Sequence, residues 1–238
     1  MTDMSPRTMA RWSGALFLAT IVGGVVAQGV LADRLVVTGD AAATARNIVA
    51  NPSVVRAAFT IFMLEMACQT ATTAVMYELL KPVDRGLARM AAAFGYVGSG
   101  IKILSRLFFY APLFVLGGSS YLAAFSQKQL ETIAYLLIRI NSQGAGMACI
   151  FLGLSTMLTG WLMLRSTFLP RALGVLGLVG GAGWLAFIYP PLGGSLFVPI
   201  ALVALLGCAV TIGWLLVRGV DERRWHAMAA ASASSVWR

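Results

Sequence analysis

Six long apolar runs dominate this sequence and leave few folds open to it. A helix needs roughly 20 apolar residues to cross the hydrocarbon core of a bilayer. Closed β-barrels are the only other spanning structures, but these runs are too continuous for alternating strands. We therefore predict an all-α integral membrane bundle of six transmembrane helices. The expected spans are about 10–31, 54–80, 87–116, 144–164, 171–188 and 196–217.

Composition agrees with a membrane protein and argues against a nucleic-acid partner. The 238 residues are 59% hydrophobic and 11% charged, whereas soluble domains are about 45–50% apolar and about 25% charged. A net charge of +9 in a soluble protein would indicate nucleic acid. Here there is no basic run and no nucleic-acid-binding motif, so we assign the cations to short loops that orient the spans.

The distribution of Lys and Arg predicts that both termini are cytoplasmic, as expected for a multi-pass protein of the plasma membrane. Arg7 and Arg11 also resemble the start of a signal peptide, but the apolar run after them is longer than the usual signal core, so we expect it to be retained. The cytoplasmic side then holds Arg7, Arg11, Lys81, Arg85, Arg89, Arg165, Arg171, Arg218, Arg223 and Arg224.

Two outer segments predict short interfacial helices. "GDAAATARNIVAN" carries Asp40 as its expected N-cap, and "SQKQLETIAYLLIRI" has Ser126 as cap with Gln129 as capping-box partner. Residues 1–220 are expected to form one transmembrane domain. Residues 221–238 are polar and rich in small side chains, which predicts a disordered tail.

Three ionisable residues, Glu65, Lys102 and Arg106, lie well inside the expected spans, where each is costly. Glu65 precedes Lys81 by sixteen residues and Lys102 follows Arg85 by seventeen. At about 1.5 Å per residue, both lie at about the same depth in antiparallel neighbours joined by a short turn. Arg106 shares the face of Lys102 by the i,i+4 rule.

Polar neighbours extend this group into a candidate binding site. We predict a site for an amphipathic or lipid-like anion, because two cations face one acid. The alternative is a purely structural ion pair with Arg106 directed outward toward the interface. The predicted ligand-binding residues are Glu65, Gln69, Lys102, Arg106, Arg139 and Asn141.

The site leaves more than one class of function open. The favoured class is a non-enzymatic binder that serves as a sensor, an accessory subunit or a small carrier. The alternative is a membrane-embedded enzyme that acts on a lipid or isoprenoid with Glu65 as the acid, similar in architecture to small terpene cyclases. A proton-coupled carrier is a third option, but internal repeats are missing.

No cofactor or metal is expected. His226 is the single histidine, and Cys68, Cys149 and Cys208 show no C-x-x-C spacing. Gly177 and Gly181 form a G-x-x-x-G in the fifth span, which predicts close helix packing within the bundle, with homodimerisation through these glycines as the alternative.

Four stretches carry a family resemblance: "TGDAAATARNIVANPSVVRAAF", "YELLKPVDRGLA", "RSTFLPRALGVLGLVGGAGWL" and "GWLLVRGV". Together they resemble the bacterial DUF4386 membrane family over about residues 10–220. The resemblance implies a six-span helical membrane domain but no activity, because the family has none assigned. An acid commonly follows the glycine of the last span in that family; here Cys208 follows Gly207, so no site residue is carried over.

Overall fold

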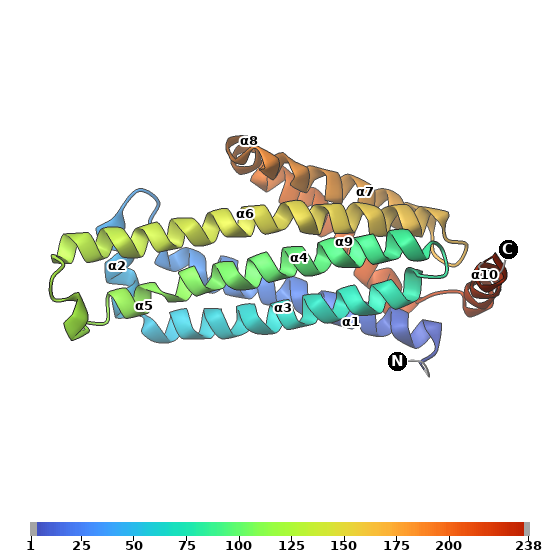
Figure 1. Ribbon diagram of the computed structural model, residues 1–238, viewed down its shortest axis with the longest axis horizontal. Coiled ribbons are helices and arrows are strands. Elements are labelled where there is room, and N and C mark those ends of the chain that lie inside the picture. The colour runs from blue at the N-terminus through green and yellow to red at the C-terminus, as the bar shows by residue number, and fades with distance from the viewer. Residues whose placement is uncertain (1–3, 236–238) are drawn as a thin grey trace. The chain divides into compact units, whose positions relative to one another are not determined.

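The structure is a computed structural model that describes residues 4–235, and every regular element within them is a helix (Figure 1). The predicted all-α fold is confirmed. The elements are α1 (Pro6–Gly24), the π-helix η1 (Val25–Ala32), η2 (Asp33–Leu35), α2 (Ala41–Ala50), α3 (Pro52–Leu80), α4 (Arg85–Tyr110), α5 (Pro112–Val115), η3 (Ser120–Leu122), α6 (Gln127–Arg165), α7 (Arg171–Trp184), η4 (Leu185–Ile188), α8 (Pro190–Ser195), α9 (Phe197–Val217) and α10 (Glu222–Ser235).

The chain divides into two compact units, each with its own core. Unit 1 comprises Met1–Leu18, Cys68–Ser99 and Gly146–Arg238, and unit 2 comprises Ala19–Ala67 and Gly100–Ala145. Helices α1, α3, α4 and α6 each contribute one part to each unit.

Among the described residues, five helical segments are long and apolar enough to cross a membrane: Pro6–Ala32, Pro52–Leu80, Gln127–Arg165, Arg171–Ile188 and Phe197–Val217. The remaining expected span, 87–116, corresponds to α4, which has a sufficient length of 26 residues. It is not among the five, and Lys102 and Arg106 lower its hydropathy. The assignment of α4 as a span stays a prediction, as do the cytoplasmic termini.

Helix α4 also ends earlier than expected. The predicted span continued to residue 116, but α4 stops at Tyr110 and the four-residue α5 begins at Pro112. Proline has no backbone N–H to donate, and its ring clashes with the preceding turn, so a helix does not pass through it unbroken.

In unit 2, α2 confirms the helix predicted for the first outer segment. The side chain of Asp40 accepts a hydrogen bond from the N–H of Ala43 at 2.8 Å, as an N-cap should. Ile48 of α2 is buried, whereas Val49 is exposed. The buried apolar core of this unit comes from η1, η2, α2, α3, α4 and α6: Ala27, Ala32, Leu35, Ile48, Val55, Ala58, Phe62, Phe109 and Ile138.

Helix α6 corrects the prediction of a separate second interfacial helix. The predicted capping box is present, since the N–H of Ser126 donates to Gln129 Oε1 at 2.8 Å. The helix then continues without a break through Arg165 for 39 residues. Residues 139–144 contain no proline, and Ser142 Oγ donates to the carbonyl of Ile138 within the helix, so nothing there stops it.

In unit 1, glycines bring α6 and α7 into backbone contact. A Cβ added at Gly160 would lie 2.7 Å from the carbonyl oxygen of Gly174, and one added at Gly181 would lie 2.7 Å from that of Gly153. A Cβ at Gly177 would lie 3.0 Å from the Cα of Gly160. The G-x-x-x-G therefore packs within the chain. A homodimer through Gly177 and Gly181 stays a prediction, and it would require α6 and α7 to separate.

The remaining helices of unit 1 complete its core. Helix α7 packs beside α9, with α8 at the connection between them (Figure 1). The buried members of this core include Met9 and Ala10 of α1, Leu79 of α3, Leu162 of α6 and Leu215 of α9.

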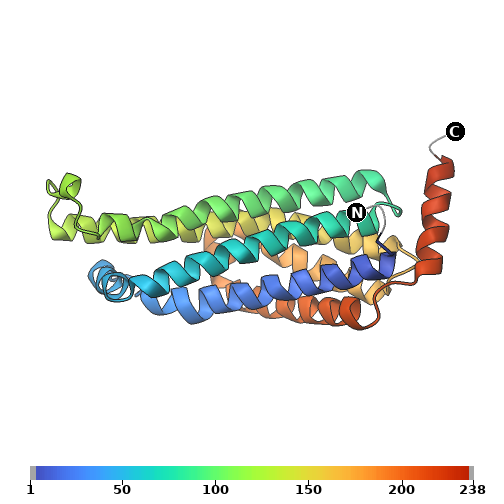
Figure 2. The same cartoon turned by 90° about the horizontal axis from the view of Figure 1, so that it is seen from below.

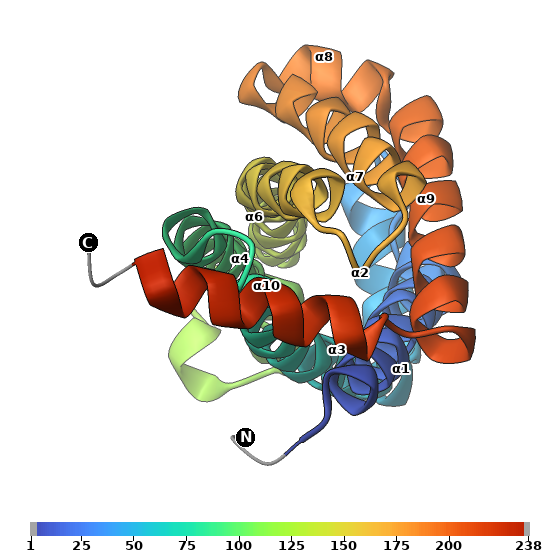
Figure 3. The same ribbon diagram turned by 90° about the vertical axis from the view of Figure 1, so that its right-hand side faces the viewer.

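The segment expected to be a disordered tail forms a helix in the structure. Asp221 explains where α10 begins, because its carboxylate accepts a hydrogen bond from the N–H of Arg224 at 3.2 Å. Helix α10 runs crosswise to α9 (Figure 2) and passes the ends of α3 and α4 (Figure 3). Trp225 Nε1 donates to the carbonyl of Leu79 at 2.9 Å, which fixes the helix on α3. Residues 236–238 of the predicted tail lie outside the described residues.

The close contact between α6 and α7 predicts that Gly160→Ala destabilises the protein by about 1–3 kcal/mol, because backbone atoms of Gly174 and Leu178 cannot move aside cheaply. Thermal unfolding in detergent measures this. The matched control is Gly213→Ala in α9, where an added Cβ meets nothing within 4 Å. That variant is expected to be as stable as the parent or slightly more stable. Equal melting temperatures for both variants would contradict the packing.

Candidate functional site

The centre of the candidate site is an ion pair between α3 and α4 in unit 2. Lys102 Nζ lies 2.6 Å from Glu65 Oε1. The side chain of Glu65 is 3% exposed and that of Lys102 is 21% exposed. Glu65 and Lys102 were predicted to lie at the same depth, and the structure brings them into contact. The acid is buried, and the base is partly exposed.

Two glycines of α1 make room for the acid. A Cβ added at Gly24 would lie 3.1 Å from Glu65 Oε1, and one added at Gly23 would lie 3.4 Å from Glu65 Cβ. The second oxygen, Oε2, is buried and accepts no hydrogen bond from the part of the chain that the structure describes. A buried polar atom of this kind is costly, so the position of Glu65 depends on its pairing with Lys102.

Arg106 lies one turn further along α4 and is buried, with 3% of its surface exposed. Its Nη1 donates to Asn141 Oδ1 of α6 at 3.2 Å. The flat face of the guanidinium lies over the ring of Phe62, with Cζ 3.6 Å from the ring centroid. Charge–quadrupole attraction to an aromatic face is favourable and strengthens when the cation is desolvated. Arg106 is therefore directed into unit 2, and not outward toward the interface.

Gln28 connects Arg106 to an exposed acid. Its Oε1 accepts from Arg106 Nη1 at 3.5 Å, and its Nε2 donates to Asp33 Oδ1 at 2.6 Å. Gln28 lies in the π-helix η1, and single-turn π segments often occur at functional sites. The amide thus links a buried cation to an exposed carboxylate.

Four residues at this site were not predicted from the sequence: Gln28, Gly23, Gly24 and Phe62. Gln28 had a usable signal, because it is the one polar side chain between Thr20 and Asp33. An isolated amide in an apolar helix is expected to find a partner. The glycines had no such signal, since glycine is common in membrane helices.

Two predicted site residues are not among these contacts. Arg139 is exposed on α6, since it lies two residues before Asn141 and so on a different side of the helix. Gln69 is half-buried on α3, where its carbonyl accepts a hydrogen bond from Thr73 Oγ1 at 3.0 Å, and its part in the site stays a prediction. The group that the structure assembles is therefore Glu65, Lys102, Arg106 and Asn141, joined by Gln28, Asp33 and Phe62; we call it the charged cluster.

The side chains of the charged cluster are two cations, the buried carboxylate of Glu65, the exposed carboxylate of Asp33, two amides and an aromatic ring. Within residues 4–235, no group of three or more His, Cys, Asp or Glu side chains lies close enough together to hold a metal ion.

Comparison with known protein families gives one match. The model of DUF4386, described as a domain of unknown function, matches residues 12–219, which is most of the chain. The protein belongs to the DUF4386 family. Neither curated proteins nor solved structures provide a match. This DUF4386 protein is thus a multi-pass helical membrane protein whose family has no assigned activity.

The ion pair predicts unequal costs for its two single substitutions. Lys102→Met leaves the 3% exposed Glu65 unpaired and is expected to cost about 3 kcal/mol. Glu65→Gln costs less, because Lys102 is partly exposed and its long side chain can reach a more polar region. The double variant is expected to recover most of the loss, as measured by thermal unfolding in detergent.

A second ion pair serves as the control for that double-mutant cycle. Glu78 and Lys81 pair near the end of α3 with side chains 29% and 39% exposed. The corresponding changes there are expected to alter stability by at most about 1 kcal/mol. Additive losses at Glu65 and Lys102 would show that their contact contributes no stability.

The contact of Arg106 with α6 predicts that Asn141→Leu destabilises the protein by about 1.5–3 kcal/mol, because a buried charged donor loses an acceptor. The neighbouring Gln143 is exposed on the same helix. Gln143→Leu is therefore the matched control and is expected to leave the melting temperature unchanged. A similar small effect of both changes would argue against the hydrogen bond.

Proposed function

We propose that this DUF4386 protein binds an amphipathic anion, with its charged head at Lys102. The observation that carries the proposal is the unequal burial of the ion pair. The side chain of Glu65 is 3% exposed, whereas 21% of the side chain of Lys102 is exposed. An anion from outside the cluster would therefore meet the side chain of Lys102 before that of Glu65.

The charge of the cluster favours an anion. Lys102 and Arg106 carry two positive charges, and Glu65 carries one negative charge. The amides of Gln28 and Asn141 contribute dipoles but no net charge. Asp33 is exposed, so solvent screens it more strongly than the buried groups. With Asp33 counted, the formal charges of the cluster sum to zero, so the positive excess lies among Lys102, Arg106 and Glu65. An arriving carboxylate or phosphate would balance that excess.

The surroundings of the cluster suit the apolar tail of such an anion. Leu64 on α3 and Ile103 on α4, the chain neighbours of Glu65 and Lys102, are 62% and 40% exposed. Large exposed apolar side chains on membrane helices face acyl chains. A ligand with an apolar tail can therefore lie against the same two helices that provide the charged groups.

The geometry favours this function over an enzyme that uses Glu65 as an acid. A general acid must come within hydrogen-bond reach of its substrate, and Glu65 Oε1 is occupied by Lys102 while the side chain is almost wholly buried. A sensor, an accessory subunit or a small carrier would each use the cluster in the way proposed. We further propose the bacterial inner membrane as the location, because spanning proteins of the outer membrane are β-barrels.

The test is photo-crosslinking with a long-chain fatty acid that carries a diazirine in its tail, followed by peptide mass spectrometry. Adducts are expected on α3 and α4. Glu65→Gln removes the acid that competes for Lys102, so labelling is expected to rise. The double variant Glu65→Gln/Lys102→Met removes the cation as well, and labelling is expected to fall about tenfold, equivalent to about 1.4 kcal/mol.

The control is Lys128→Met, which removes an exposed cation from the first turn of α6 and is expected to label like the parent. Each variant is compared below its melting temperature as a single species in size-exclusion chromatography. Equal labelling of Glu65→Gln and the double variant would overturn the proposal. Loss of labelling in Glu65→Gln alone would overturn it too, since it would make the carboxylate the essential group.

A further inference from the structure

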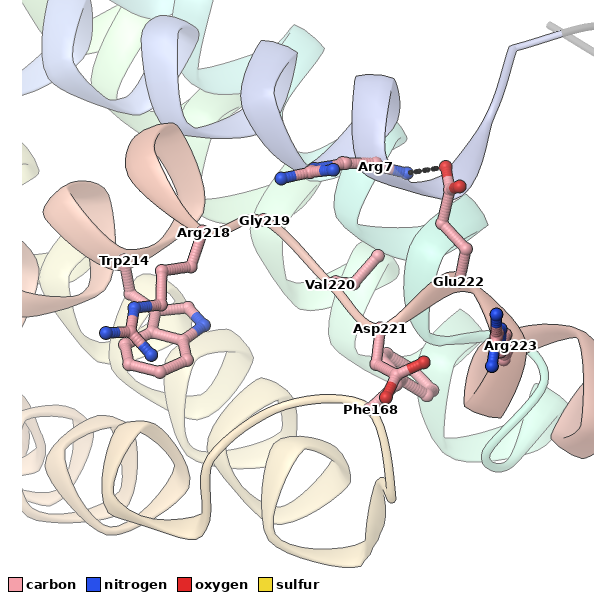
Figure 4. A pocket seen from close by; sticks show the side chains of 9 residues that line it. All are labelled: Arg7, Phe168, Trp214, Arg218, Gly219, Val220, Asp221, Glu222 and Arg223. Atoms are coloured by element: carbon pink, nitrogen blue, oxygen red, sulfur yellow. Dashed lines mark hydrogen bonds between the residues drawn. The ribbon is translucent and has the colours of Figure 1, made fainter.

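A separate pocket lies in unit 1, where the end of α9 meets the starts of α1 and α10 (Figure 4). It is open and has a volume of about 540 Å³. Three arginines from three different elements line it: Arg7 of α1, Arg218 at the end of α9 and Arg223 of α10. None of these residues belongs to the charged cluster.

An aromatic ring orients one of the arginines. Arg218 lies over the ring of Trp214, with Cζ 5.1 Å from the ring centroid, and Figure 4 shows its guanidinium folded back across the indole. Stacking holds the planar group but leaves its N–H edges available. Those edges match the oxygens of a phosphate in a bidentate arrangement.

The turn after α9 brings Arg7 to the same pocket. Gly219 has a φ of +66°, in the left-handed region that favours glycine. A Cβ added there would lie 3.1 Å from Arg7 Cγ. The turn therefore lets the stem of Arg7 lie close to the backbone, and in Figure 4 its guanidinium extends along the side of the pocket nearer to Arg218.

The two acids of the pocket already have partners. Asp221 Oδ1 accepts from the N–H of Arg224, and its Oδ2 lies 3.3 Å from Arg224 Nε. Glu222 Oε1 accepts from the N–H of Arg7 at 3.2 Å. Hydrogen bonds from the Ser5 hydroxyl and from this N–H lower the pKa of Glu222, so it is ionised and engaged at neutral pH.

The pocket lies where two membrane-spanning segments end. Segment Pro6–Ala32 begins one residue before Arg7, and segment Phe197–Val217 ends one residue before Arg218. Lipid phosphates lie at this boundary, and tryptophan and arginine are typical of it. We propose that this pocket binds a phosphate-bearing anion, held by Arg7 and Arg218, with Arg223 as a third positive charge. An anionic phospholipid headgroup and free phosphate share this chemistry.

The experiment uses the full-length protein in detergent and counts bound phosphatidylglycerol by native mass spectrometry. Arg7→Gln/Arg218→Gln is expected to reduce retention at least tenfold, because two charge-assisted contacts are lost. The matched control, Arg11→Gln/Arg171→Gln, removes two exposed arginines outside the pocket and is expected to retain lipid like the parent. In a second arm, inorganic phosphate is added and thermal unfolding is measured. This arm distinguishes free phosphate from a phospholipid headgroup as the ligand.

If phosphate raises the melting temperature of the parent but not of Arg7→Gln/Arg218→Gln, the proposed pocket is supported. Free phosphate is then sufficient for binding there. Selective lipid loss without a phosphate effect supports it and identifies the headgroup. If the double variant does not fold, Arg223→Gln replaces it, because Arg223 is exposed on α10. This variant is also expected to retain less phosphatidylglycerol than the parent. Equal retention by pocket and control variants overturns the proposal. Glu65→Gln/Lys102→Met is expected to leave lipid retention at this pocket unchanged. Failure of the function proposed for the charged cluster can therefore be told apart from failure of the pocket proposal.

Discussion

The ion pair between Glu65 and Lys102 is the interaction on which unit 2 depends. A carboxylate that is 3% exposed among apolar helices is tolerated only if a cation and space are provided together. Lys102 provides the cation from α4, and Gly23 and Gly24 of α1 provide the space. One acid therefore dictates residue types on two other helices. Large side chains at those glycines would push Glu65 away from its partner.

Arg106 shows a different way to accommodate a charge. Its neighbours include an amide oxygen of Asn141, a second amide oxygen of Gln28 and the ring of Phe62. These groups solvate the guanidinium with dipoles and a quadrupole and add no negative charge to the interior. Lys102, by contrast, is held by the full negative charge of Glu65.

Helical periodicity and loop register were enough to predict the main features of this fold and part of its site. The short connection between α3 and α4 determines which residues share a depth, and Glu65 and Lys102 meet as that register requires. The Asp40 and Ser126 caps were predictable because capping chemistry is local. The end of α4 before Pro112 is likewise a local effect, because proline donates no backbone N–H to a continuing helix.

Other features depend on geometry that a regular helix does not have. Gln28 reaches Arg106 from a π-helix, in which each turn holds more residues than in an α-helix, so ideal periodicity does not locate its side chain. The 39-residue α6 joins the predicted interfacial helix to a span. The two parts are continuous because no helix-breaking residue lies between them, and no sequence motif announces such continuity. Asp221 caps α10, and Trp225 anchors it on α3 through tertiary contacts that composition does not reveal.

The hydrogen bond between the N–H of Arg7 and Glu222 joins residues 215 positions apart in the chain. Together with the anchor of Trp225 on Leu79, it connects the start of α1 and the end of α3 to helix α10, which follows the last of the five candidate spans among the described residues. A chain closed into a loop has fewer open conformations than a linear chain, and the entropy of closing a loop grows only slowly with its length. Because α10 follows these segments in the chain, its contacts can form only after the last of them has been synthesised.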